Sequence, residues 1–177
     1  TPDVATRVLA TLEALTATQP TPVPITTPTP SSGNWYYKEV TDLLNDAKSY
    51  TAALYASEGV SAFGERFALA ASCQDFADGT TKAAVLVEWG SVVNLESTSV
   101  EYRFDSEDSQ ESLWQVTKDG TATVLIMSKA IAFIQSIYES ERLVLRVEPF
   151  FGSSLTAVFE LAGADVALEQ GKKVCGW

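Results

Sequence analysis

The stretch RFALAASC, residues 66–73, indicates which kind of fold this chain adopts. Phe67, Leu69, Ala71 and Cys73 occupy alternate positions, so an extended strand places all four side chains on one inward face. KAAVLVEW (82–89) is apolar on both faces, as in a central strand. The same alternation recurs in SVEYRFD (99–105), RLVLRVEPF (142–150) and SLTAVFELAG (154–163), and LWQVTKDGTATVLIM (113–127) predicts a hairpin with its turn at Asp119-Gly120.

Three other segments show helical spacing. Residues 128–140 predict a helix that starts with Ser128 as N-cap and buries Ile131, Ile134 and Tyr138. Residues 164–173 predict a short helix capped by Gly171. Residues 35–57 also predict a helix, whose buried stripe comprises Val40, Leu43, Leu44, Ala47, Tyr50 and Leu54.

These patterns predict one domain over residues 35–177. It has six or seven strands, and because most of them are sequence neighbours we expect them to be antiparallel. The fold class is therefore α+β, an antiparallel β-sandwich or curved sheet with two or three helices.

Two further segments precede the domain. Residues 1–18 predict an amphipathic helix, an assembly arm whose apolar stripe comprises Val4, Val8, Leu9, Leu12 and Leu15. Residues 19–34, QPTPVPITTPTPSSGN, hold five of the seven prolines and predict a polyproline-like linker. Its threonines resemble an O-glycosylated stalk, and a plain tether is the alternative; the candidate acceptors are Thr21, Thr26, Thr27 and Thr29.

Composition limits the classes of function. The net charge of −11 argues against nucleic acid and anionic membrane as partners. No apolar run reaches the roughly 20 residues that a membrane-spanning helix needs. The chain begins at Thr1 without Met, and we expect a mature, exported product.

The two cysteines, Cys73 and Cys175, have two interpretations. One is a reactive thiol, but the chain has no histidine to activate it. The other is a structural disulfide, which implies a compartment outside the reducing cytosol.

A family resemblance rests on four features of residues 65–177: the strand that ends at Cys73, the YRFD of residues 102–105, Trp114, and the terminal CGW of residues 175–177. In these the chain resembles a small exported domain of bacterial type VI secretion-associated accessory proteins. The resemblance implies a β-rich domain closed by Cys73–Cys175, without established catalytic residues.

Three sets of polar residues are candidate sites. Arg103 and Asp105 share a face by parity and Trp114 follows nearby, which suggests a site for a polar ligand or a structural ion pair. DSEDSQE (105–111) has the oxygen ligands that calcium prefers but not the EF-hand pattern, so an exposed acidic loop is the alternative. Asp42 and Asp46 are spaced as paired carboxylates or as one solvated helix face.

No catalytic, metal-binding or cofactor motif stands out, and we expect neither an enzyme nor a resident metal or cofactor. The leading hypothesis is a non-catalytic, exported structural subunit at the cell surface. Its arm packs between other copies of the chain to form an extracellular filament or surface assembly. The alternative is a monomeric envelope or periplasmic module, tethered by its N-terminus, that binds a cell-wall or secretion component.

Overall fold

The computed structural model describes residues 29–30, 33–44, 46–94 and 96–177. These residues form ten strands and three helices. The strands are β1 (Thr29–Pro30), β2 (Tyr36–Thr41), β3 (Lys48–Val60), β4 (Arg66–Asp75), β5 (Thr81–Glu88), β6 (Ser97–Phe104), β7 (Gln110–Val116), β8 (Ala122–Ile126), β9 (Arg142–Val147) and β10 (Leu155–Glu160), and the helices are α2 (Met127–Glu139), α3 (Ala164–Ala167) and α4 (Glu169–Cys175).

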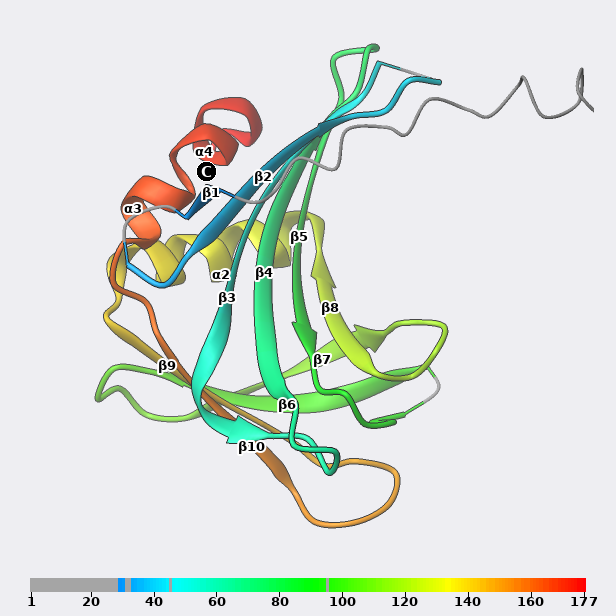
Figure 1. Cartoon of the computed structure of the whole chain (residues 1–177), viewed down its shortest axis with the longest axis vertical. Coiled ribbons are helices and arrows are strands. Elements are labelled where there is room, and N and C mark those ends of the chain that lie inside the picture. The colour runs from blue at the N-terminus through cyan, green and yellow to red at the C-terminus, as the bar shows by residue number, and fades with distance from the viewer. Residues whose placement is uncertain (1–28, 31–32, 45, 95) are drawn as a thin grey trace, which may run out of the picture.

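Eight of the strands close into an antiparallel barrel (Figure 1). Around the barrel the order is β3-β10-β9-β6-β7-β8-β5-β4, and β4 pairs with β3 to complete the ring. β2 pairs with the first part of β3 outside this ring, and β1 pairs with β2. The predicted α+β class with a β-sandwich or curved sheet is therefore wrong, because the fold is mostly β and its sheet closes into a barrel.

Closure depends on a bend in β3. Its register with β4 shifts between Tyr55 and Val60, so β3 is irregular at this point. Beyond Tyr55 the strand turns to β10, where Glu58 pairs with Val158. Gly59 lies at this crossing with φ of 100°, and a Cβ there would sit 2.2 Å from the carbonyl oxygen of Thr156. The seam between β3 and β10 therefore requires glycine at this position.

The helix predicted over residues 35–57 is wrong, because this segment forms the β2–β3 hairpin. In β3 the inward side chains are Tyr50, Ala52, Leu54 and Ala56, which follow a period of two. Leu43 and Leu44, expected in a helical core stripe, are instead highly exposed at the hairpin tip. Asp42 and Asp46 flank this tip, so they do not form one helix face.

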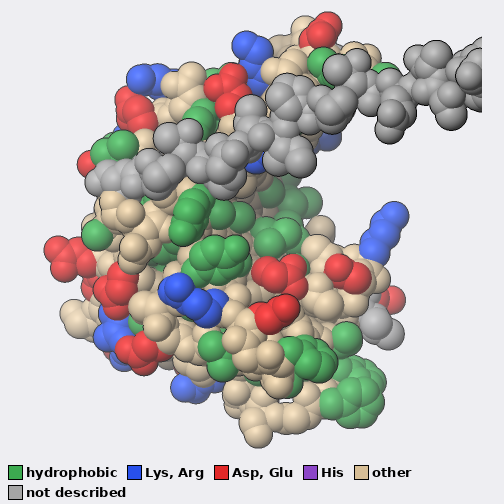
Figure 2. All heavy atoms as spheres, viewed as in Figure 1, with side chains coloured by type: hydrophobic (Ala, Val, Ile, Leu, Met, Phe, Trp, Pro, Cys, Tyr) green, Lys and Arg blue, Asp and Glu red, His purple; other side chains and the backbone are tan. Residues whose placement is uncertain are grey.

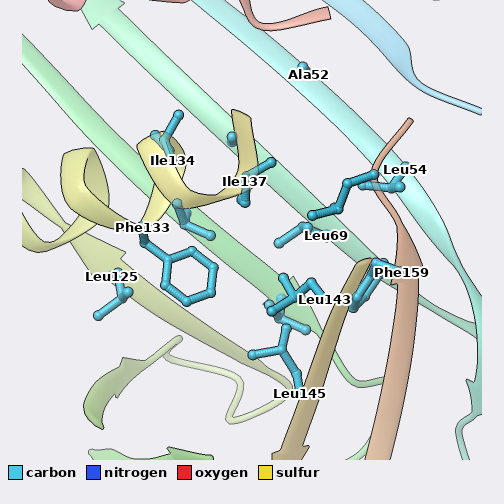
Figure 3. Packing of buried hydrophobic residues seen from close by; sticks show 14 of the residues in the cluster. Ala52, Leu54, Leu69, Leu125, Phe133, Ile134, Ile137, Leu143, Leu145 and Phe159 are labelled. Carbon is cyan, nitrogen blue, oxygen red and sulfur yellow. The ribbon is translucent and has the colours of Figure 1, made fainter. Parts of the chain in front are cut away.

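Helices α2 and α4 cover the same side of the sheet, and α3 packs against both of them (Figure 1). α2 packs on β5 and α4 packs on β4. Neighbouring strands present small inward residues there: Ala52 pairs with Ala71, and Cys73 pairs with Ala83. Small side chains leave room for a helix to approach the sheet at normal packing density. Figure 3 shows Ile134, Ile137 and Phe133 of α2 directed into the core of the barrel.

The predicted helix after residue 127 is present, but its first turn differs. α2 begins at Met127, whose φ is 59°, and its N-cap is Ile126 rather than the predicted Ser128. Ile134 is buried as expected, whereas Ile131 and Tyr138 are only partly buried. The turn at Asp119-Gly120 between β7 and β8 is confirmed, since Gly120 lies at φ of 78° and its N–H donates to the carbonyl of Thr117.

The C-terminus is fixed to the barrel by the predicted disulfide. Cys73 of β4 is bonded to Cys175 of α4, 102 positions further along the chain. Gly171 is not a cap but an interior residue of α4, and the C-cap is Gly176 with φ of 70°. A Cβ on Gly171 would lie 2.7 Å from the ring of Trp177, so the glycine makes room for this buried indole.

The predicted arm, residues 1–18, lies outside the described residues, as do the glycosylation candidates Thr21, Thr26 and Thr27. Of the predicted linker, Thr29–Pro30 form β1, in which Thr29 pairs with Tyr37. Trp35 is fully buried next to the linker, and its indole N–H donates to the carbonyl of Leu161 at 3.3 Å.

Candidate functional site

The structure does not bring Arg103, Asp105 and Trp114 together. Arg103 lies exposed on the outer face of β6. The Asp105 carboxylate accepts hydrogen bonds from the backbone N–H groups of Glu141 and Arg142, at 3.0 and 2.9 Å, and thereby holds the β6–β7 turn against the start of β9. Trp114 is fully buried in the barrel. The proposed polar-ligand site at these three residues is therefore not assembled.

The acidic segment 105–111 forms the β6–β7 turn and the start of β7. Its Glu107, Asp108 and Glu111 are exposed. Among the residues that the structure describes, no group of three or more carboxylate, cysteine or histidine side chains is arranged to hold a metal ion. The segment contributes instead to the rim of a cleft beside it.

This cleft, of about 350 Å³, opens in the barrel wall between β7 and α2. Its floor consists of Phe104, Leu125 and Phe133, each only 5% exposed. Figure 3 shows the ring of Phe133 pointing from α2 into the core, with Leu125 nearby. The ring of Phe133 also meets those of Tyr102 and Trp114 edge to face, with centroids 5.1 and 5.2 Å apart. The floor is thus buried and largely aromatic.

The cleft exists because β7 and β8 separate. They pair only at Gln115 with Val124 and Val116 with Thr123. Continuing that register would place Leu113 opposite Ile126, yet the ladder has already ended there. Along the edge of β7 that faces β8, residues 110–114 pair with none of the described strands. An unpaired edge leaves backbone N–H and carbonyl groups open to another strand.

The opposite wall is one stripe of α2. Lys129, Ala132, Phe133 and Ser136 recur at helical spacing, and all four line the cleft. Lys129 forms no ion pair within four ångströms with any acidic residue of the described chain. Glu107 and Gln110 lie on the facing rim. Polar groups therefore surround an apolar floor, which is the usual composition of a binding site.

Apolar side chains also gather at the two ends of the barrel. At one end three loops and the last residue of β3 present a surface that we call the loop patch, formed by Val60, Phe63, Val92, Phe150 and Phe151. Phe63 and Phe151 are each 82% exposed. Figure 2 shows hydrophobic side chains at the lower edge of the molecule, where Figure 1 places the β9–β10 loop.

The loops of this patch support one another. The N–H of Phe150 donates to the carbonyl of Val92 at 3.3 Å, which joins the β9–β10 loop to the β5–β6 loop. Gly90 of the β5–β6 loop packs against Ser61 of the β3–β4 loop, because a Cβ on Gly90 would lie 3.1 Å from the Cβ of Ser61. The β5–β6 loop therefore touches both of the other loops. The rings of Phe150 and Phe151 meet edge to face at 4.7 Å.

At the other end of the barrel the β2–β3 hairpin exposes Leu44 by 97% and Leu43 by 82%, and we call these two residues the hairpin tip. The tip is a defined turn. The N–H of Asp42 donates to the carbonyl of Ala47, and the Asp42 carboxylate accepts the N–H of Leu44, both at 2.8 Å.

Three groups with shifted pKa values lie away from the cleft. Burial, and then the nearby charge of Glu39, raise the pKa of the Tyr37 phenol. Hydrogen bonds from threonines lower the pKa of Asp78 and of Asp119, each in a turn between strands. These shifts follow from local structure and do not indicate acid–base chemistry.

Sequence reasoning missed Phe133 and Lys129 as site residues. Their spacing with Ser136 on the predicted helix was visible, but the opening beside β7 was not, because it depends on where a long-range ladder ends. The loop patch was missed for a similar reason: its three loops come from distant parts of the chain.

The likeness to solved structures is confined to the fold. The crystal structure of invasion associated protein B from Bartonella henselae is similar over 85% of this chain and all of that chain, with a TM-score of 0.55 and 13% sequence identity. No family model and no curated protein sequence matches the chain. Among the described residues, no helix has both the length and the apolar character required to span a membrane.

Proposed function

We propose that this chain is a non-catalytic, exported structural subunit whose copies associate head to tail at the cell surface. The observation that carries the proposal is the pair of different apolar surfaces at opposite ends of β3. This strand has 13 residues, which separates the hairpin tip from the loop patch by about 40 Å at 3.3 Å per residue. A head-to-tail contact between two different surfaces gives a ring if the rotation between copies closes, and an open helical fibre if it does not.

The disulfide supports an extracytoplasmic location, because such bonds persist in oxidising compartments. The predicted arm, with Val4 and Leu12 in its stripe, would add to the contact between copies. O-glycosylation of the linker and a role beside a type VI secretion machine stay predictions.

Sedimentation velocity of the full chain at increasing salt tests the proposal. The net charge of −11 makes copies repel one another, so we expect larger species to appear as salt screens that repulsion. Leu44→Asp and Phe151→Asp should each remain monomeric. Val166→Asp is the control, because Val166 is an exposed apolar residue of α3 and belongs to neither surface. A wild-type chain that stays monomeric at high concentration and in high salt contradicts the proposal.

The cleft favours a second candidate, a tethered module that binds a component of the cell envelope. Its test is co-sedimentation of the full chain with purified cell-wall material. Limited proteolysis separates the two candidates: an arm that only tethers the domain should be cleaved in the native protein, and an arm within an assembly should be protected.

A further inference from the structure

We infer that the cleft between β7 and α2 binds an extended peptide segment of another protein, which adds a strand to the open edge of β7. The inference rests on the binding-module candidate above and is independent of head-to-tail association. It names the ligand class as a peptide with apolar side chains at alternate positions and a basic residue at one end.

The open edge accounts for the extended backbone of the ligand. Residues 110–114 of β7 are paired with β6 on one side only, whereas the ladder to β8 ends at Gln115 and Val124. Five residues of free edge run for about 17 Å, enough for a short strand. In strand addition the main-chain hydrogen bonds supply affinity, and pockets for alternate side chains supply specificity.

The two sides of the gap account for the apolar side chains. Successive side chains of an added strand point to opposite faces of the sheet. Those pointing inward meet the floor of Phe104, Leu125 and Phe133, and the cleft volume of about 350 Å³ is at the lower end of the usual range for binding pockets. Those pointing outward pass between Leu113 and Ile126, which are 62% and 44% exposed.

Charge accounts for the basic end. Glu107 and Asp108 are exposed in the β6–β7 turn, just before the free edge begins at Gln110, and Glu107 lines the cleft. Lys129 is the one cation that lines the cleft. Glu107 lies on the rim that faces Lys129, and the exposed Asp108 is next to it in the chain, so this end of the cleft favours a peptide whose lysine or arginine lies over the β6–β7 turn.

The probe is the hexapeptide KLTVSV, acetylated, amidated and labelled with fluorescein, titrated with the full chain by fluorescence anisotropy. Two further peptides carry N-methyl groups at odd or at even positions. Alternate N–H groups point to opposite edges of a strand, and only one edge faces β7. We expect one N-methylated peptide to bind about tenfold more weakly and the other to bind like the parent.

Protein variants locate the site. Ala132→Trp fills the cleft from an exposed position on α2 and should weaken binding by about tenfold or more. Gln135→Trp adds the same bulk at an exposed position of α2 outside the cleft lining and should leave binding unchanged. Glu107→Lys should weaken KLTVSV about two- to fivefold and strengthen ELTVSV.

Several outcomes would overturn the inference. These are no binding of KLTVSV, equal binding of both N-methylated peptides, or equal effects of Ala132→Trp and Gln135→Trp. A dimer that Ala132→Trp dissolves would show that a second copy, rather than a peptide, occupies the edge. If the peptide fails while co-sedimentation with the cell wall persists, the module candidate stands without this ligand.

Discussion

The seam between β3 and β10 is the most demanding contact of the barrel, and Gly59→Ala tests it. Gly59 has φ of 100°, where an L side chain is strained, and its Cβ would lie 2.2 Å from the carbonyl oxygen of Thr156. Real Cβ atoms essentially never approach a neighbour within 3.0 Å, so the backbone of β10 must move by most of an ångström. Strain and displacement together should lower the free energy of unfolding by about 2–4 kcal/mol.

Gly64→Ala is the matched control. Gly64 lies in the adjacent β3–β4 loop with φ of 81°, but a Cβ there meets nothing within 4 Å. Its substitution costs backbone strain alone, about 1–2 kcal/mol. The difference between the two variants therefore measures the close approach at the seam.

Urea unfolding followed by tryptophan fluorescence measures both variants. Trp35, Trp89 and Trp114 are fully buried, so unfolding exposes three indoles that report on the barrel. The stabilities can be compared if the variants have the same m-value, which is the slope of the unfolding free energy against urea concentration. If Gly59→Ala costs no more than Gly64→Ala, the barrel is not closed where the structure places its seam.

Three other perturbations have defined outcomes. Cys175→Ala opens a loop of 102 positions and should cost about 4–5 kcal/mol in urea unfolding, a loss that reduction of the wild-type chain should reproduce. Gly171→Ala should lower the free energy of unfolding by about 1–3 kcal/mol, although alanine has the better helix propensity, because the new Cβ displaces Trp177. Near-ultraviolet circular dichroism should detect the displaced indole. Gly79→Ala is the control, since a Cβ there meets no neighbour and should leave the Trp177 signal unchanged. Folding raises the pKa of the Tyr37 phenol above its usual value of 10.0, so the phenol ionises at lower pH in the unfolded chain than in the folded one. The free energy of unfolding should therefore fall as pH rises through and beyond 10.0. In thermal unfolding, Tyr37→Phe should flatten this decline.

For most of the chain, the alternation of apolar residues was enough to predict where the strands lie. From β4 onward, alternation of large apolar residues such as Phe67 and Leu69 coincides with real strands, and α2 follows its helical spacing. Of the two interpretations of the cysteines, the structural disulfide between Cys73 and Cys175 is confirmed.

The β2–β3 hairpin could not be predicted in the same way. Alanines at positions 52 and 56 weaken the alternation of β3, while Leu43 and Leu44 completed an apparent helical stripe. In the structure the alanines face inward, and the leucines form the exposed hairpin tip. Small inward residues leave room for the helices that pack on the sheet, and this packing joins segments that are distant in the sequence.

Barrel closure and the cleft depend on long-range pairing. A sequence shows that strands exist but not that β3 bends from β4 to β10 at Gly59, or that β7 leaves β8 after two pairs. Asp105 shows that candidate sites are limited in the same way. Its position in the alternation suggested a ligand contact, but its carboxylate accepts hydrogen bonds from the backbone N–H groups of Glu141 and Arg142, where β9 begins.

Pairwise cross-linking tests head-to-tail association most directly. Thr41→Cys places a thiol beside the hairpin tip, and Ser153→Cys places one beside the loop patch; both positions are exposed, and the apolar residues remain in place. Mixed in high salt with a short bismaleimide, the two variants should couple to each other, while neither couples to itself. Coupling of either variant to itself at equal yield, or no coupling in the mixture, would contradict association through two different ends of the barrel.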